Sequence, residues 1–280
     1  MPPEPRTRFA PSPTGLLHLG HAFSALTAWD RAKALGGVCL LRIEDIDTPR
    51  CRPEFEAAIN DDLRWLGLDW PEPVMRQSAR MPAYRAALDR LAVAGLVYPC
   101  RCTRGDIRAA LSAPHEGDGP PPYPGTCRGR DMAQAGPADA IRLHLDRVLD
   151  TLGPDLPGWQ ETGTDTPGPR RLDPHALHAL GDPVLARRDI GTSYLLAVVV
   201  DDAAQGITEA VRGADLLAET PMQVLLAAAL GLRARAFHHH RLIRDALGRR
   251  LAKRDDARSL QALRAEGATA QDIRAMLGMG

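Results

Sequence analysis

Two histidines follow a turn rich in proline and glycine near the start of the chain. Residues 8–21 read Arg-Phe-Ala-Pro-Ser-Pro-Thr-Gly-Leu-Leu-His-Leu-Gly-His, which places His18 and His21 three residues apart. The pattern predicts a short buried strand over 6–10 and a helix from Gly20. Unpaired N–H groups at a helix start favour anions, and two imidazoles beside them suit a phosphate that gains charge in a transition state. An ordinary strand–turn–helix connection is the alternative.

Three carboxylates follow the second predicted strand. Residues 38–43 read as a buried strand, and Glu44, Asp45 and Asp47 come directly after it. In a doubly wound parallel sheet, ligands bind at the carboxyl ends of the strands. These carboxylates could therefore hold an amino group, a ribose or Mg²⁺, or they could only cap the turn before the next helix.

Three of the five cysteines are spaced like metal ligands. Cys100 and Cys102 form a Cys-x-Cys pair, and Cys127 comes after a loop rich in proline and glycine. Three thiolates suit tetrahedral Zn²⁺, and chemistry alone favours His115 as the fourth ligand. Such a zinc ion would be structural, because it would order a loop that could not otherwise order itself. Three unliganded thiols are the alternative.

The second half of the chain carries an apolar run followed by polar residues. Residues 194–200 form the most apolar run, and 201–215 contain Asp-Asp and then Thr-x-x-x-Arg-Gly-x-Asp. Residues 151–169 are dense in Gly, Pro, Thr and Asp and predict turns or a mobile loop. Three histidines at 238–240 invite a metal site, which we reject because successive residues of a strand point to opposite faces.

The composition narrows the class of protein. A chain of 280 residues can bury a full core, and one domain plus a small insertion is expected. The formal net charge of zero argues against binding of nucleic acid by bulk charge, although a local basic face is compatible with it. No apolar run is long enough to span a membrane, and the N-terminus is not a signal peptide. We expect a cytoplasmic protein in a reduced compartment, with a monomer as the default.

Residues 8–20 closely resemble the first motif of class I glutamyl-tRNA synthetases. The family also carries an Arg-x-Glu-Asp-x-Asp string, found here at 42–47, and residues 250–254 resemble its second motif, usually Lys-Met/Leu-Ser-Lys-Ser/Arg. In that second motif Arg250 replaces the first lysine and Ala252 replaces the serine, whereas Lys253 is kept. The resemblance covers nearly the whole chain, and the motifs come in the expected order.

The resemblance implies an α/β fold. It would have a Rossmann-like parallel sheet as the catalytic domain of a class I synthetase, a small zinc-binding insertion and a short helical C-terminus. The implied boundaries are 1–97 and 184–254 for the two halves of the catalytic domain, 98–183 for the insertion with the zinc site, and 255–280 for the C-terminal helices.

The resemblance also implies roles for particular residues. The residues expected at glutamate are Arg8, Phe9, Ala10, Pro11, Ser12, Glu44, Tyr194 and Arg212. Arg8 and Arg212 could each pair with one of the two glutamate carboxylates, since an arginine holds a carboxylate through two hydrogen bonds. The catalytic residues expected at the ATP phosphates are His18, His21 and Lys253. For zinc, related short enzymes imply Tyr123 as the fourth ligand, in place of His115, beside Cys100, Cys102 and Cys127.

A short, zinc-carrying catalytic domain is similar to the glutamyl-Q tRNA(Asp) synthetase family. This implies a ligase that activates glutamate with ATP and Mg²⁺ without needing tRNA for that step, and then transfers glutamate to the queuosine base of tRNA(Asp). Two alternatives stay open. One is a truncated glutamyl-tRNA synthetase that charges tRNA(Glu). The other is a non-catalytic RNA-binding relative, which the altered second motif would suit.

Overall fold

Strand, turn and helix alternate at the start of the chain, as predicted. In the computed structural model, which describes residues 4–109, 123–243 and 258–279, strand β1 (Arg6–Phe9) is followed by helix α1 (Leu19–Ala34) and strand β2 (Val38–Ile43). Strands β1 and β2 pair in parallel, with Arg6 opposite Val38. Helix α1 ends where Gly36 takes a positive φ of 68°, a conformation that glycine adopts at low cost.

The remaining elements continue this alternation. After β2 come α2 (Pro53–Trp65), β3 (Met75–Arg76), α3 (Met81–Val93), β4 (Val97–Cys100), α4 (Arg104–Ala109), β5 (Ala140–Leu143), α5 (Leu145–Leu152), β6 (Gly158–Glu161), β7 (Gly168–Arg171), α6 (Pro174–Leu180), β8 (Val184–Ala186), α7 (Tyr194–Ala204), β9 (Glu209–Gly213), α8 (Thr220–Ala229), β10 (Ala236–His240), α9 (Leu260–Ala265) and α10 (Ala270–Met276). Short 3₁₀ helices precede α3, β5 and α8.

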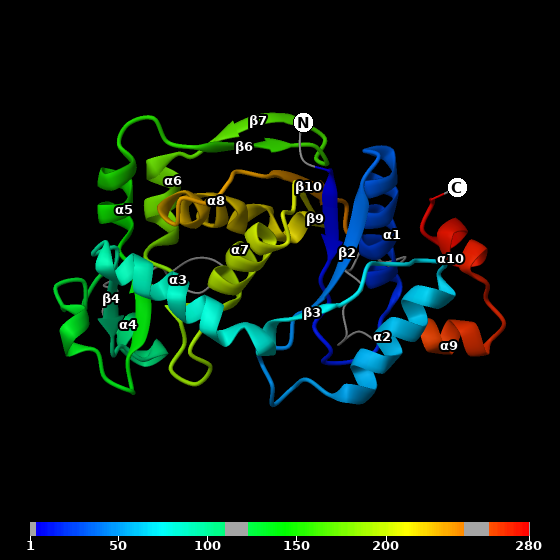
Figure 1. Ribbon diagram of the computed structural model, residues 1–280, viewed down its shortest axis with the longest axis horizontal. Coiled ribbons are helices and arrows are strands. Elements are labelled where there is room, and N and C mark those ends of the chain that lie inside the picture. Colours follow the sequence, from blue (N-terminus) through cyan, green and yellow to red (C-terminus); the bar gives the residue numbers. More distant parts are fainter. Residues whose placement is uncertain (1–3, 110–122, 244–257, 280) are drawn as a thin grey trace.

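Two groups of parallel strands lie next to each other at the centre of the molecule (Figure 1). One is ordered β1-β2-β3, and the other is ordered β7-β6-β10-β9, with only β7 antiparallel. Between the groups, the amide of Thr208 donates to the carbonyl of Arg6 at 2.9 Å, which places β9 beside β1. Helices flank these strands, so the predicted α/β fold with a parallel sheet is confirmed.

A third sheet lies apart from the parallel strands. It is antiparallel with the order β4-β5-β8, and β4 ends at Cys100. In Figure 1 it lies at the opposite end of the molecule from α1 and the C-terminal helices. Of the three predicted zinc-binding cysteines, Cys100 therefore lies on a separate small sheet, and Cys102 and Cys127 lie between β4 and β5.

The prediction of turns over 151–169 is wrong in part. The segment contains β6 and the first half of β7, and these two strands form an antiparallel hairpin with Trp159 opposite Arg170. Each strand is only four residues long, and β7 is an exposed edge with the sequence Gly-Pro-Arg-Arg, so neither has an apolar alternation to detect. The hairpin is held by β10, where Phe237 pairs with Glu161.

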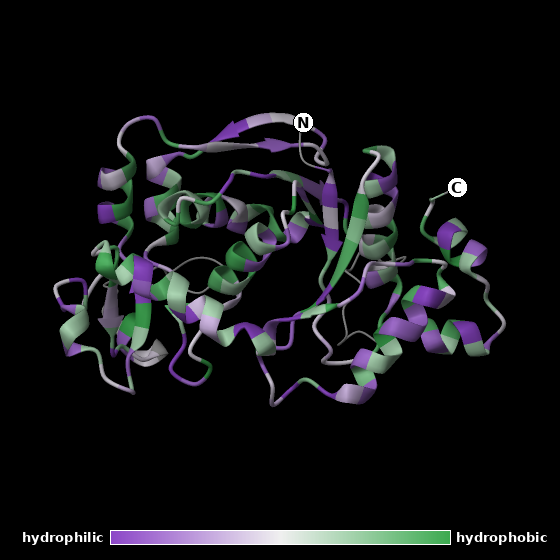
Figure 2. Cartoon of the chain, viewed as in Figure 1, coloured by the Kyte–Doolittle hydropathy of each residue, from purple (hydrophilic) through white to green (hydrophobic). Residues whose placement is uncertain are grey.

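Within the described residues, two large apolar clusters and a small one around the cysteines form the core. One surrounds α7 and α8, whose residues are among the most apolar in the chain, and Figure 2 shows the apolar colour gathered there and in β2. The other lies between α1, α2 and the C-terminal helices α9 and α10. Arg274 on α10 pairs with Asp30 on α1 at 3.0 Å, which fixes the chain end against the first helix.

Some expectations fall outside the described residues. Lys253, Arg250 and Ala252 of the second motif lie in 244–257, and His115 lies in 110–122. Among the helices of the described ranges, none combines the length and the apolarity needed to cross a bilayer.

Candidate active site

A cleft of about 510 Å³ opens at the carboxyl ends of β1, β2, β9 and β10. Its walls bring together every predicted glutamate and phosphate residue that the structure describes. These residues are Arg8, Phe9, Ala10, Pro11, Ser12, His18, His21, Glu44, Tyr194 and Arg212. These residues lie up to 204 positions apart in the sequence. The parallel strands bring them together, because the carboxyl ends of such strands meet at one edge of the sheet.

His18 and His21 meet at the N-terminus of α1, where their ring centroids lie 3.9 Å apart. Nδ1 of His18 accepts a hydrogen bond from the amide of Gly20 at 3.1 Å, and Nδ1 of His21 accepts one from the amide of His18 at 3.3 Å. Because both Nδ1 atoms act as acceptors, each ring carries its proton on Nε2. The start of the helix thus presents imidazole N–H donors, which suit an anion.

Arg8 reaches the cleft from β1 and is only 4% exposed. Its Nε donates to Oδ1 of Asp202 at 3.1 Å, and its Nη1 donates to the carbonyl of Val211 at 2.7 Å. These two hydrogen bonds hold the guanidinium in one orientation at the inner wall. A buried cation that is fixed in this way can receive a carboxylate without further ordering of its own side chain.

Arg212 lies on the neighbouring strand β9 and is equally buried. Its Nε donates to Nε2 of His239 at 3.1 Å, and its Nη2 donates to the hydroxyl of Thr220 at 2.6 Å. Its Nη1 is buried and has no hydrogen-bond partner among the described residues. A buried guanidinium nitrogen without a partner is costly, and Arg212 lines the cleft, so this nitrogen is a candidate donor to a bound ligand.

Glu44 and Tyr194 complete the polar wall. Glu44 accepts a hydrogen bond from Nη2 of Arg42 at 3.1 Å, while its amide donates to the carbonyl of Pro11 at 3.0 Å. Burial raises the pKa of the Glu44 carboxyl, although Arg42 and Arg8 oppose this. Burial, followed by the charge of Glu44, raises the pKa of Tyr194, so its hydroxyl stays protonated at neutral pH. One carboxyl group and one phenol therefore face the two arginines.

The buried charges behind the cleft were missed by the sequence reasoning. Asp202 lies under the wall and contacts Arg8, Arg42 and Arg235, and it is fully buried. Burial alone would raise its pKa, but these guanidinium groups lower the pKa of Asp202 well below its usual range. One feature of the sequence could have indicated these buried charges. The Asp-Asp pair stands at the end of an apolar run, and a charged residue that is buried there needs a partner of opposite charge.

Asp201, the neighbour of Asp202, binds side chains of the segment 77–84. Its carboxylate accepts from Gln77 Nε2 at 3.0 Å, Arg80 Nε at 2.6 Å and the hydroxyl of Tyr84 at 2.7 Å. Ser78 donates through its hydroxyl to Asp45 at 2.6 Å. The two aspartates therefore hold residues of the inner wall in place, although neither aspartate lines the cleft itself.

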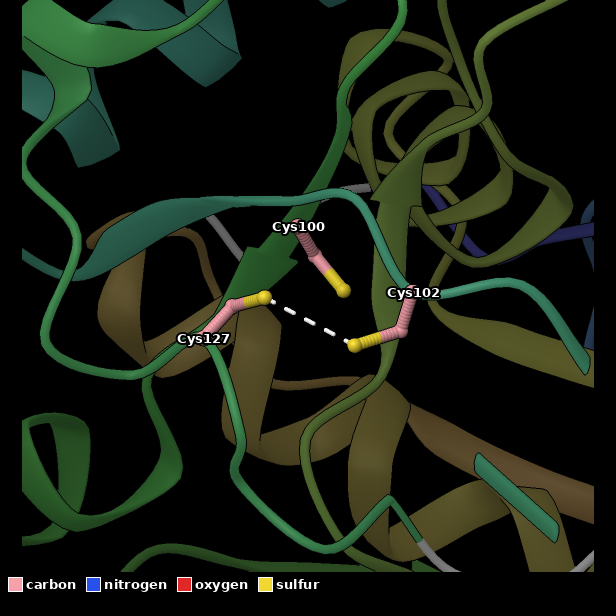
Figure 3. A group of neighbouring side chains, drawn as sticks. All are labelled: Cys100, Cys102 and Cys127. Carbon is pink, nitrogen blue, oxygen red and sulfur yellow. Dashed lines mark hydrogen bonds between the residues drawn. The ribbon is translucent and has the colours of Figure 1, made fainter. Parts of the chain in front are cut away.

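The cysteines form a separate group. The Sγ atoms of Cys100, Cys102 and Cys127 all lie within 4.8 Å of one another, and Figure 3 shows the three side chains turned towards a common point. Sγ of Cys102 is 3.6 Å from Sγ of Cys127. The hydroxyl of Tyr123 lies 3.5 Å from Cys100 Sγ and 3.6 Å from Cys102 Sγ. These four side chains could hold a metal ion.

A model of the family described as "tRNA synthetases class I (E and Q), catalytic domain" matches residues 4–131 and 172–279. The chain belongs to this family. It is therefore a class I synthetase by descent, and its relatives are ligases. The unmatched residues 132–171 include the hairpin β6–β7, which contributes Glu161 behind the cleft.

Curated relatives match this synthetase along most of its length. A protein of Rhodobacter capsulatus named glutamyl-Q tRNA(Asp) synthetase is 53% identical over 98% of this chain and 99% of its own. A protein of Nitratidesulfovibrio vulgaris with the same name is 44% identical over 98% of this chain and 85% of its own. The match therefore spans nearly the whole of the first relative and most of the second.

Solved structures agree with the fold. A crystal structure of a glutamate tRNA ligase from Elizabethkingia meningosepticum in complex with its amino acid superposes with a TM-score of 0.76 at 26% identity. The match covers 99% of this synthetase but 61% of that ligase. A Mycobacterium tuberculosis methionyl-tRNA synthetase in complex with methionyl-adenylate has a TM-score of 0.63 at 13% identity, which supports the fold alone.

Proposed function

We propose that this synthetase activates glutamate with ATP and transfers it to the queuosine base of tRNA(Asp). The observation that carries the proposal is the single cleft with two buried arginines at its inner wall and two histidines at its helix start. The arginines suit a dicarboxylic amino acid, and the histidines suit a phosphate chain. The names of the long-matching relatives favour queuosine over other acceptors.

In the first step, an oxygen of the glutamate α-carboxylate attacks the α-phosphorus of ATP, and pyrophosphate leaves with the electrons of the broken P–O bond. The carboxylate is already ionised, so no general base is needed. The chain contributes positioning and charge stabilisation. Arg8 and Arg212 would bind the glutamate carboxylates, Glu44 would bind its amino group, and Ser12 and Tyr194 would border it. Phe9, Ala10 and Pro11 would shape the wall.

The imidazoles of His18 and His21 would donate from Nε2 to the phosphate oxygens as charge builds during the attack. We further propose that Lys253 contacts the departing pyrophosphate, with Mg²⁺ accompanying ATP as part of the substrate. In the second step, a hydroxyl of queuosine attacks the carbonyl carbon of the mixed anhydride. AMP leaves, and the hydroxyl proton passes to solvent.

A second hollow supports the approach of the second substrate. It has a volume of about 330 Å³ and shares Ser12, Glu44 and Tyr194 with the cleft. Asp47 and Arg50 also line it, whereas His18 and His21 line the cleft alone. A nucleoside that entered here would meet the residues proposed to border glutamate.

We propose that the cysteine group holds one structural Zn²⁺. In a tetrahedral site two thiolates lie about 3.8 Å apart, and a thiolate and an oxygen lie about 3.5 Å apart. The distance of 3.6 Å between Cys102 and Cys127, and those of 3.5 and 3.6 Å from Tyr123, agree with these values. The amide of Cys127 donates to the Tyr123 oxygen at 2.7 Å, and the guanidinium of Arg142 lies 3.9 Å above its ring. Both features would favour a phenolate ligand. Burial, followed by the hydrogen bonds with the three cysteines, raises the pKa of Tyr123, so the metal ion itself would have to displace the phenol proton.

The domain boundaries inferred from the sequence are part of the same proposal. Residues 1–97 and 184–254 would form the catalytic domain, 98–183 the insertion with the zinc site, and 255–280 the C-terminal helices. The placement of the cleft residues in the first and third segments, and of the four proposed zinc ligands in the second, supports this division.

The test is transfer of labelled glutamate, with ATP, to tRNA(Asp) that carries queuosine. The same tRNA with guanosine in place of queuosine, and unmodified tRNA(Glu), serve as parallel acceptors. We expect label only on the tRNA with queuosine, together with glutamate-dependent exchange of pyrophosphate into ATP in the absence of tRNA. Label on tRNA(Glu) would instead identify a truncated glutamyl-tRNA synthetase. The absence of both label and exchange would leave a non-catalytic RNA-binding relative.

A further inference from the structure

His239 lies in the middle of a buried chain of hydrogen bonds that ends at Arg212. The ring is 1% exposed and is stacked on Phe237 at 5.9 Å between ring centroids. On one side, Nδ1 of His239 lies 2.6 Å from Oε2 of Glu161. On the other side, Nε2 of His239 accepts from Nε of Arg212 at 3.1 Å. The chain therefore runs from the hairpin β6–β7, through β10, to β9 at the cleft.

The partners of His239 determine its tautomer. A guanidinium nitrogen can only donate, so Nε2 of His239 must be the acceptor in the contact with Arg212. The ring proton therefore lies on Nδ1 and is donated to Glu161. Since a doubly protonated ring would have no acceptor for Arg212, His239 is neutral here.

Glu161 is well suited to keep that tautomer. It is fully buried, and its Oε1 accepts hydrogen bonds from the amides of Gly163 at 3.0 Å and His239 at 3.1 Å. Burial alone would raise its pKa, but these amides and the His239 ring outweigh it, so the pKa of Glu161 lies below the ordinary value. An ionised carboxylate can only accept, which leaves Nδ1–H as the one compatible state of the ring.

The chain also determines which nitrogen of Arg212 is left without a partner. Nε is taken by His239 and Nη2 by Thr220, whose hydroxyl lies 3.1 Å from the same ring nitrogen. Nη1 is the nitrogen that has no partner among the described residues. If His239 stopped accepting from Nε, the guanidinium could rotate and Nη1 would lose its orientation.

We propose that Glu161 and His239 act as positioning residues that orient Arg212 for a ligand carboxylate. The proposal rests on the proposed binding of glutamate in the cleft, and it assigns a role to Glu161, which lies in the part of the chain that the family model does not match. Glu161 determines the tautomer of His239, and that tautomer allows His239 to accept from Nε of Arg212. This hydrogen bond in turn orients Nη1 of Arg212.

The first test is Glu161→Gln. The amide can keep its Oε1 bonds to the two backbone amides, but it turns an N–H towards Nδ1 of His239. The ring then shifts its proton to Nε2, where it faces the N–H of Arg212, and the hydrogen bond is lost. We expect KM for glutamate to rise about 10-fold, as for the loss of a hydrogen bond to a charged group, with KM for ATP changed less than 2-fold. Glu54→Gln, at an exposed glutamate of α2, is the matched control.

Two further measurements separate positioning from a structural role. Nitrogen chemical shifts of the His239 ring report its tautomer directly, and we expect Nδ1–H in the wild type and Nε2–H in Glu161→Gln. His239→Gln, whose amide oxygen can still accept near the Nε2 position, should bind glutamate more tightly than His239→Leu. The proposal is overturned by an unchanged tautomer, by equal glutamate affinities of the two His239 variants, or by equal rises in both KM values.

Failure of the proposed function would look different. If the wild type supports no glutamate-dependent exchange of pyrophosphate into ATP, calorimetric titration with glutamate alone replaces KM as the measure of affinity. If glutamate binds tightly to the wild type and more weakly to Glu161→Gln, the positioning role of Glu161 and His239 is supported even though the proposed reaction is not. Equal affinities of the two proteins for glutamate would overturn the positioning role, whatever reaction the cleft performs.

Discussion

Asp202 on α7 accepts a hydrogen bond from Nε of Arg8 on β1 at 3.1 Å, and both side chains are at most 4% exposed. The carboxylate of Asp202 also accepts a hydrogen bond from Nη1 of Arg42 at 2.7 Å, and it forms an ion pair with Nε of Arg235 at 3.2 Å. One buried anion thus holds three cations behind the cleft. Because Arg8 is among these cations, the stability of the fold and the orientation of a proposed glutamate-binding group depend on the same carboxylate.

Asp202→Asn should therefore reduce stability and glutamate binding together. Loss of the charge leaves buried arginines with less compensation, and we expect the free energy of unfolding at pH 7 to fall by about 3 kcal/mol. The lowered pKa of Asp202 stabilises the fold fully above the unfolded pKa of about 4. That stabilisation is lost as the pH falls further. Denaturant unfolding at pH 7 and pH 3 measures this, with exposed Asp89→Asn as control. A gap between wild type and variant that does not narrow at pH 3 would contradict the assignment.

Asp62 on α2 gives the opposite pH dependence. Its side chain is fully buried beside α9, and neither carboxylate oxygen has a hydrogen-bond partner among the described residues. Burial raises the pKa of Asp62 to about 6, even with Arg264 nearby. The cost of burying the charge is absent below pH 4, grows between pH 4 and 6 as the unfolded chain ionises, and is constant above.

We therefore expect Asp62→Asn to be more stable than the wild type at pH 8 by about 1–2 kcal/mol, and equally stable near pH 4. Thermal or denaturant unfolding across this range provides the measurement. The exposed neighbour Asp61→Asn should show a much smaller gain. A stabilisation of Asp62→Asn that is already present at pH 4 would point to packing instead of charge.

The cysteine group should carry zinc. We expect about one zinc ion per chain by elemental analysis of the wild type. Cys102→Ser should lose most of it, and Cys51→Ser, outside the group, should keep it. Burial raises the pKa of the Cys127 thiol, but hydrogen bonds from Tyr123 and a backbone amide outweigh it and lower the pKa to about 7. Since protons compete with the metal for thiolates, the affinity for zinc should fall as the pH is lowered. If Cys102→Ser retained its zinc, the cysteine group would not be the site that holds the metal.

His18 can be tested without damage to its helix. Asparagine is a good N-cap and can replace Nδ1 as the acceptor for the amide of Gly20, but it does not reproduce the Nε2–H donor. We expect His18→Asn to lower the rate of glutamate-dependent pyrophosphate exchange about 10²–10³-fold, with glutamate affinity nearly unchanged. His175→Asn, at an exposed residue of α6, serves as the control. An equal loss of glutamate affinity would show that the substitution disturbs the whole cleft.

The local pattern of the sequence already determined the first half of the fold. The strand over 38–43 is found unchanged, and the helix predicted from Gly20 begins at Leu19, because an apolar period is a local property of the sequence. The motif residues could also be listed in advance, since each lies in a short string with its own chemistry. The Cys-x-Cys pair and the later cysteine are likewise close in space, as their spacing indicated.

Only the tertiary structure decided what holds those residues in place. The partners of Arg8 and Arg212 come from α7 and β10, and Glu161 comes from a hairpin whose sequence reads as turns. No local pattern encodes a hydrogen bond between residues 194 or 78 positions apart. Such contacts arise because burial removes water from a charged group and leaves it to find a partner within the folded chain, and which partner it finds depends on how the strands are ordered.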